Sequence, residues 1–123
     1  MKACIVLIIF FNFFSIFASE TKYQIWGTGK NYYAFSVESS TRALVSANCL
    51  DSIEKCKAIM AKKTPKKITI TQAQLSGGKN PSSLLCSLGH HGEVVVLQDS
   101  KGNENSFCLF ADHTMISASD LDR

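Results

Sequence analysis

The sequence lacks any strong excess of charge, and that absence limits the class of partner. Its 123 residues include 13 lysines and arginines against 10 aspartates and glutamates, for a formal net charge of +3 at pH 7. Domains that bind nucleic acid usually carry a strongly basic face. The composition therefore argues against DNA or RNA as a partner.

A complete nucleotide-binding motif is also missing. The residues Gly27-Thr28-Gly29-Lys30 resemble part of a phosphate loop. However, the full G-x-x-x-x-G-K-[ST] spacing and the helix that should follow it are absent. We expect these four residues to form a hairpin turn instead. No internal repeat and no low-complexity segment is evident in the chain.

Catalytic and metal-binding patterns are equally weak. His90 and His91 are adjacent, and neither has a second histidine three or four residues away. We therefore predict a solvent-exposed loop pair, and keep a metal site of His90, His91 and His113 as the weaker alternative. Asp112 beside His113 could orient an imidazole, but an aspartate at a tight turn more often accepts hydrogen bonds from local amides. No catalytic residue and no cofactor is predicted.

What the sequence does contain begins with an apolar N-terminus. Lys2 is followed by an apolar run that extends to about Phe17, and then by the small residues Ala18 and Ser19. This order is typical of a secretory signal peptide. The run is shorter than the roughly 20 apolar residues of a membrane-spanning helix. We predict a signal peptide over 1–18 and a periplasmic or secreted product, with an uncleaved membrane anchor as the alternative.

The expected mature chain contains an even number of cysteines. Cleavage after Ala18 would leave 105 residues, a net charge of +2 and the cysteines Cys49, Cys56, Cys86 and Cys108. An even cysteine count in a small exported protein predicts disulfide bonds. Four cysteines allow three connectivities, and the sequence alone does not choose between them.

The hydrophobic pattern predicts an α+β fold of short antiparallel strands with two helices. Asp51 is a potential N-cap, and apolar residues recur after it at helical spacing, which indicates a helix over about 52–62. Asn80 and Pro81 are suited to start a second helix over about 81–88. Strands rich in β-branched and aromatic residues are expected at 22–26, 32–37, 43–46, 68–71, 93–98 and 106–110.

A glycine-containing segment divides the expected domain into two regions. Ser76-Gly77-Gly78-Lys79 is the predicted boundary between an N-terminal α+β region over 19–76 and a small helix–hairpin module over 77–123. The two regions could share one core or form two.

Five short segments in the second region carry a family resemblance. They are NPSSLLC at 80–86, GEVVVL at 92–97, DSKGN at 99–103, CLFAD at 108–112 and SDL at 119–121. Together they make residues 80–121 resemble a small bacterial family, domain-of-unknown-function family 333, which is labelled putative hemolysin. The resemblance implies a small, exported, cysteine-bearing α+β module of unproven activity. Residues 19–75 resemble no family that we recognise.

The resemblance also implies a disulfide pairing. It pairs Cys86 with Cys108, on the strand against which the second helix should pack. By closing a loop in the unfolded chain, this disulfide would raise the free energy of unfolding by roughly 3 kcal/mol. Cys49 and Cys56 would then form the second pair. This pair requires Cys49 to precede the first helix, because residues seven apart on one helix lie about 10 Å apart. The other pairings would cross-link the two regions.

The sequence therefore predicts a non-enzymatic exported protein that binds a macromolecule in the envelope or outside the cell. An inhibitor-like protein is one form of this function. The candidate contact residues are Lys62, Lys63, Lys66, Lys67, Trp26, Tyr32 and Tyr33. One alternative is a membrane-active, hemolysin-like toxin, for which no apolar segment of sufficient length remains after the signal peptide. The other is a small histidine-dependent hydrolase.

Overall fold

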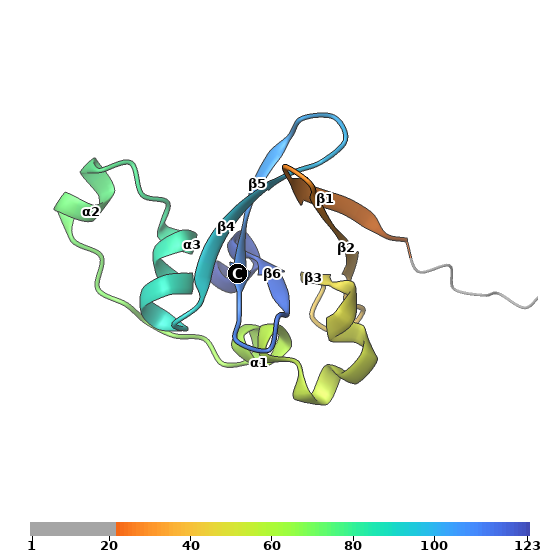
Figure 1. The fold of residues 1–123 in the computed structure, drawn as a ribbon. Helices are drawn as coiled ribbons and strands as arrows, with labels where there is room; N and C mark the ends of the chain where they lie inside the picture. The colour runs from red at the N-terminus through yellow and green to blue at the C-terminus, as the bar shows by residue number, and fades with distance from the viewer. Residues whose placement is uncertain (1–21) are drawn as a thin grey trace, which may run out of the picture.

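The computed structural model describes residues 22–123, which form a closed antiparallel barrel of six strands (Figure 1). The signal peptide predicted over 1–18 lies outside the described residues. The strands follow the order β1-β2-β3-β6-β5-β4 around the barrel. They are β1 (Gln24–Thr28), β2 (Asn31–Val37), β3 (Leu44–Ser46), β4 (Glu93–Gln98), β5 (Glu104–Leu109) and β6 (Met115–Ser117). The helical segments are η1 (Ala47–Lys55), α1 (Lys57–Lys63), α2 (Gln72–Ser76), α3 (Pro81–Leu84), η2 (Leu85–Gly89) and η3 (Ala118–Asp122).

The predicted α+β class with two helices is wrong. The barrel takes three strands from each half of the chain, and the longest α-helix within residues 22–123 is the seven-residue α1. Alternating apolar residues locate a strand, but they do not show whether a sheet closes. Closure depends on pairing between strands that are far apart in the sequence.

Gly29 permits the tight turn that joins β1 to β2. Its φ is 55°, and with Lys30 it makes a two-residue connection between the paired residues Thr28 and Asn31. A positive φ at the first of two turn residues is typical of the II′ turn, whose twist matches that of the flanking strands. The hairpin turn predicted at 27–30 is therefore confirmed.

Aromatic and aliphatic side chains from both halves fill the barrel interior. Phe35 and Phe107 are fully buried, and their ring centroids lie 4.4 Å apart. Trp26 meets Phe107 edge-on at 5.4 Å, and Leu97 and Met115 belong to the same cluster. Aromatic pairs of this kind add roughly 0.5–1.5 kcal/mol to the free energy gained by burial. The interior is therefore a packed core.

A second buried cluster lies between the barrel and the short helices, and it contains both disulfides. Cys86 of η2 is bonded to Cys108 of β5, and Cys49 of η1 is bonded to Cys56, with Cα–Cα distances of 5.6 and 5.2 Å. All four cysteines are buried. Both predicted pairs are confirmed.

The helix predicted over 52–62 is divided at Cys56. The 3₁₀ helix η1 ends at Lys55 and α1 begins at Lys57, while Cys56 between them is extended, with φ −70° and ψ 117°. An unbroken helix would hold Cys49 about 10 Å from Cys56, too far for a disulfide. The departure from helical geometry that the disulfide requires lies between the two cysteines, at Ser52, where φ is −154° and ψ is 76°.

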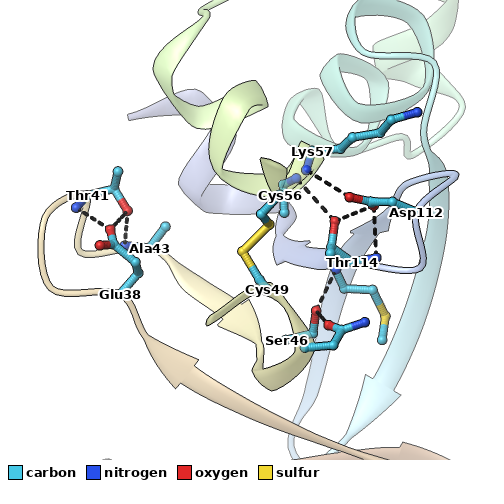
Figure 2. The surroundings of a disulfide bond; sticks show 12 residues. Glu38, Thr41, Ala43, Ser46, Cys49, Cys56, Lys57, Asp112 and Thr114 are labelled. Carbon is cyan, nitrogen blue, oxygen red and sulfur yellow. Dashed lines mark hydrogen bonds between the residues drawn. A yellow bond between two sulfur atoms is a disulfide. The ribbon is translucent and has the colours of Figure 1, made fainter. Parts of the chain in front are cut away.

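The N-cap predicted at Asp51 is also wrong, because α1 takes its cap from the other half of the chain (Figure 2). Asp51 lies inside η1. The backbone N–H of Lys57 donates to Asp112 Oδ2 at 2.9 Å, and that of Ala58 donates to Thr114 Oγ1 at 3.2 Å. Side-chain oxygens satisfy the free N–H groups of a first helical turn. This helix start therefore depends on the β5–β6 turn.

Residues 68–71 do not form the predicted strand. Ile68 and Ile70 are half-buried without strand pairing. Thr71 instead caps α2, since its Oγ1 accepts from the Gln74 N–H at 3.2 Å while Gln74 Oε1 accepts from the Thr71 N–H at 2.9 Å. An alternating pattern becomes a strand only where a partner strand lies beside it. The six-strand order leaves no such partner for this segment.

The second predicted helix is present, but only its first turn is α-helical. Asn80 Oδ1 accepts from the Ser82 N–H at 2.8 Å, and Pro81 is the first helical residue, as predicted. After Leu84 the chain continues as the π-helical turn η2, which ends at Gly89. The predicted start at 81 is confirmed, and the helical segment ends one residue after the predicted 88.

The two halves of the chain contain the same succession of elements, which corrects the expectation that no internal repeat is present. The succession β1-β2-β3-η1 recurs as β4-β5-β6-η3, after the intervening α1, α2, α3 and η2. The motif Ser-Ala-x-x-Leu-Asp occurs at 46–51 and again at 117–122, at the end of the third strand of each half. Arg42 and His113, two residues before those strands, have similar positive φ values of 62° and 65°. The repeat escapes detection because the two halves share little else in sequence.

The two halves meet across an approximate twofold axis. The shared motif makes Val45 equivalent to Ile116, and the registers of the two hairpins make Gly27 equivalent to Gln98. The two joints between the halves pair these equivalent residues with each other, Val45 with Ile116 and Gly27 with Gln98. Contact between the same surface of two like units is the isologous arrangement of symmetric dimers. The chain is thus built like a dimer joined into one polypeptide.

Gly92→Ala should destabilise the protein because of the disulfide beside it. A Cβ at Gly92 would lie 3.1 Å from Cys86 Sγ and still closer to Cys108 Sγ. We expect the free energy of unfolding of the oxidised protein to fall by about 1–3 kcal/mol in denaturant titrations. The control is Gly77→Ala, whose Cβ would meet no atom nearer than 3.5 Å. Equal stability of the two variants would contradict the predicted packing.

Candidate functional site

Of the three aromatic residues predicted to contact a partner, Trp26 is not on the surface. Its side chain is only 9% exposed, and its Nε1 donates to Gln24 Oε1 at 3.2 Å. Tyr32 and Tyr33 are 71% and 39% exposed. Side chains alternate between the two faces of a strand, and Trp26 occupies an inward position of β1. Its assignment to a contact surface is therefore wrong, and the two tyrosines remain candidates.

The predicted lysine edge divides into one structural residue and three exposed ones. Lys62 Nζ donates to the backbone carbonyls of Asp120 and Arg123, both at 2.6 Å, and so holds the C-terminal segment to α1. Lys63, Lys66 and Lys67 are exposed. Only these three remain available for a partner.

The three histidines do not form the alternative metal site. Within residues 22–123, no group of three or more histidine, cysteine, aspartate or glutamate side chains is placed to hold a metal ion. His91 and His113 are exposed, whereas His90 is half-buried, 6.5 Å from Phe110 between ring centroids. Burial and the nearby charges of Lys66 and His91 lower the pKa of His90.

A groove of about 690 Å³ lies where β1 crosses β4. Its apolar lining comes from Ile25, Tyr32 and Val96, whose side chains are 52%, 71% and 53% exposed. Exposed apolar side chains that gather in a hollow are more informative than single ones scattered over a surface. We therefore treat this groove as the candidate site and call it the seam groove.

The seam groove lies on the approximate twofold axis. Gly27 and Gln98, the equivalent residues that pair there, both line it. Ile25 is equivalent to Val96, and Tyr32 is equivalent to Glu104. One half of the groove is therefore aromatic, and the corresponding position of the other half is acidic.

A glycine at position 27 is required for Tyr32 to occupy its place in the groove. A Cβ at this position would lie 2.5 Å from Tyr32 Cδ1 and 2.6 Å from the backbone oxygen of Asn31. The tyrosine ring therefore lies against the backbone of β1 at a place where only glycine fits. Tyr32 thus lies close to the backbone of β1 and lines the groove, while its side chain stays largely exposed.

Three polar side chains of the groove, those of Gln98, Asp99 and Glu104, are hydrogen-bonded within the protein. Gln98 Nε2 donates to Glu104 Oε1 at 3.0 Å. The carboxylate of Asp99 accepts from the backbone N–H groups of Lys101 and Asn103, both at 2.9 Å, and so closes its own turn. The groove therefore offers a ligand a mixed surface, in which the apolar side chains of Ile25, Tyr32 and Val96 lie beside polar ones.

Glu38, whose pKa is strongly lowered, serves the β2–β3 turn rather than the groove (Figure 2). Its side chain is 3% exposed and accepts hydrogen bonds from the backbone and hydroxyl groups of Ser40 and Thr41, at 2.6–3.0 Å. Burial alone would raise the pKa of Glu38, but these hydrogen bonds outweigh it and lower the pKa to about 2. A strongly perturbed pKa can mark a catalytic group, yet here every contact is local. Glu38 is therefore a turn-forming carboxylate.

Asp112 has the same kind of role in the equivalent turn of the second half. Burial by itself would raise the pKa of Asp112, but hydrogen bonds from Thr114 and from the Lys57 N–H lower it. Thr114 Oγ1 donates to Asp112 Oδ1 at 2.6 Å. Asp112 thus accepts hydrogen bonds from the backbone amides of its own turn and of α1, and it does not orient the exposed His113. This agrees with the preference for local amides that was predicted from the sequence.

Comparison with known proteins yields no match: no family model, no curated protein and no solved structure matches this chain. The resemblance of residues 80–121 to the putative hemolysin family therefore stays a prediction.

Ile25 and Val96 are site residues that the sequence patterns did not predict. Each was assigned to a strand, but their meeting depends on the joint between β1 and β4, which is a single residue pair. The signal that could have located it is the repeated Ser-Ala-x-x-Leu-Asp motif. It equates the two hairpins and suggests that they pair with each other.

Replacing Glu38 by glutamine should remove an acid-sensitive contribution to stability. Because the folded pKa of about 2 lies below the ordinary 4.5, the contribution is complete above pH 4.5 and is lost as pH falls toward 2. We expect Glu38→Gln to lower the free energy of unfolding at pH 7 by about 2 kcal/mol. The difference from the wild type should shrink between pH 4.5 and 2 in urea titrations.

The matched control for that experiment is Glu54→Gln, since Glu54 is an exposed residue of η1. It should change stability by less than about 0.5 kcal/mol at any pH. A constant difference between wild type and Glu38→Gln across the pH range would show that the charge of Glu38 is not what stabilises the turn.

Proposed function

We propose that this protein is an exported, non-enzymatic binding protein that holds a macromolecular partner through the seam groove. The observation that carries the proposal is the gathering of Ile25, Tyr32 and Val96, each more than half exposed, around one hollow. Tyrosine is favoured at protein interfaces because it offers a large rigid apolar body with one polar end. The partner is a protein or peptide with apolar side chains.

The location of the protein is consistent with this proposal. Its two disulfides fit an oxidising extracellular or periplasmic environment. Among residues 22–123, no helix is long and apolar enough to cross a membrane. The signal peptide over 1–18 and the choice between periplasm and secretion belong to the proposal.

A second exposed surface can contribute to recognition. Lys63, Lys66 and Lys67 lie in the segment after α1 and at its end. Surface charges chiefly raise the rate of association with an acidic partner and contribute little affinity. We therefore assign the affinity to the groove and at most a steering role to these lysines.

Tyr32→Ala should abolish partner capture without unfolding the protein. Tyr32 is 71% exposed, so we expect the melting temperature to change by less than about 2 °C. Immobilised oxidised protein would be exposed to envelope or host extract, and retained proteins would be quantified by mass spectrometry. The expected result is at least a tenfold loss of the specifically retained protein.

The control is the triple variant in which Lys63, Lys66 and Lys67 are replaced by alanine. It should retain the same protein at equilibrium and bind it more slowly at low salt. If the triple variant loses the partner while Tyr32→Ala keeps it, the lysines and not the groove form the binding surface.

A further inference from the structure

Beside the seam groove, β4 has an edge that is not paired. All six residues of β4 pair with β5, but on its other side only Gln98 has a partner, Gly27 of β1. The stretch from Glu93 to Leu97 is therefore paired with β5 on one side and with no strand on the other. An unpaired strand edge is a template for a further strand.

The hairpin register identifies the backbone groups that this edge presents. The Asp99 N–H donates to the Asn103 carbonyl at 3.0 Å, and hydrogen-bonded pairs then recur at every second residue of an antiparallel ladder. Val95 and Leu97 therefore bond to β5, whereas Val94 and Val96 direct their N–H and C=O groups away from it. Gln98 follows the same alternation, in agreement with its pairing to Gly27.

The sequence of the edge contains none of the usual devices that prevent pairing. Natural edge strands are often protected by proline, by lysine or by a bulge. The stretch 93–97 reads Glu-Val-Val-Val-Leu, with a single charge at its start. Consecutive β-branched residues hold the backbone extended, so the edge is preformed for a partner strand.

Hollows for alternate side chains of an added strand lie along the same edge. Val96 lines the seam groove, and Val94 and Val96 both line a second hollow of about 420 Å³ that Leu84 and Ser87 close on the helical side. In strand addition, main-chain hydrogen bonds supply affinity and pockets for alternate side chains supply specificity. At Ile25, the equivalent residue of β1, the groove is lined by strand and turn residues and by no residue of a described helix.

We propose that β4 binds an extended peptide segment of the partner as an added antiparallel strand, with apolar side chains at alternate positions. This inference rests on the proposed binding function and specifies the chemistry of its partner. The added strand hydrogen-bonds to the N–H and C=O groups of Val94 and Val96. Its outward side chains enter the seam groove and the hollow beside α3.

The test is amide hydrogen exchange with a defined probe. The probe is a six-residue peptide of alternating threonine and valine, blocked at both ends, added to the oxidised protein. The amides of Val94 and Val96 should exchange at least tenfold more slowly with saturating peptide. Those of Val95 and Leu97, already bonded to β5, should not change.

A control peptide of the same sequence, N-methylated at alternate residues, should give no protection. Unchanged exchange at Val94 and Val96 with the probe, or equal protection by the control peptide, would overturn the proposal. Protection that grows with protein concentration in the absence of peptide would also overturn it, because the occupant would then be a second copy of this chain.

Two matched variants distinguish the edge of β4 from the equivalent edge of β1. Val96→Pro removes the outward N–H without disturbing a bond to β5, and Ile25→Pro makes the same change at the equivalent residue of β1. Val96→Pro should eliminate the protection of Val94 by the peptide, and Ile25→Pro should preserve it. Loss of protection in both variants would overturn the assignment to β4.

Other outcomes distinguish a failure of the proposed groove binding from a failure of strand addition. If Tyr32→Ala abolishes partner capture while the captured partner leaves Val94 and Val96 unprotected, the groove binds the partner and strand addition is wrong. If Tyr32→Ala keeps the partner and the two amides are protected, the edge binds it and the groove does not.

Discussion

The pairing of the two halves of the chain at two single residue pairs is the constraint on which the structure depends. Val45 with Ile116 and Gly27 with Gln98 close two three-stranded units into one barrel. Phe35 and Phe107 then meet inside it. A three-stranded unit of about 30 residues buries too little surface to be stable alone. Association of the units is therefore what provides each of them with a core.

Hydrogen bonds between the halves reinforce these joints where the strand pairing is short. The N–H of Leu44 donates to Asp120 Oδ2, and the N–H of Met115 donates to Ser46 Oγ, both at 2.8 Å. Asp112 and Thr114 cap α1 from the opposite half. The disulfides act differently, because each is closed within one half and stabilises its unit mainly by restricting the unfolded chain.

Local features of the fold could be predicted from the sequence, and its long-range features could not. The hairpin turn at 27–30 and the helix start at Asn80–Pro81 follow from residue types and spacing, whereas the two disulfide pairs were predicted from the family resemblance. The barrel, the break at Cys56 and the cap from Asp112 depend on residues brought together by folding. The strand predicted over 68–71 failed for the same reason, since a suitable pattern has no effect without a neighbouring strand. The candidate site belongs to the second group, because Ile25 and Val96 meet only at a joint between distant strands.

The same joint connects the fold to the proposed function. Pairing at Gly27 and Gln98 alone leaves the strands free to diverge on either side, which exposes the seam groove and the edge of β4. The central claim is therefore that the two halves form one barrel across two narrow joints. The most direct measurement is nuclear Overhauser contacts between backbone protons in the oxidised protein. The account predicts contacts between Val45 and Ile116 and between Gly27 and Gln98, and contacts within each hairpin without any between the halves would contradict it.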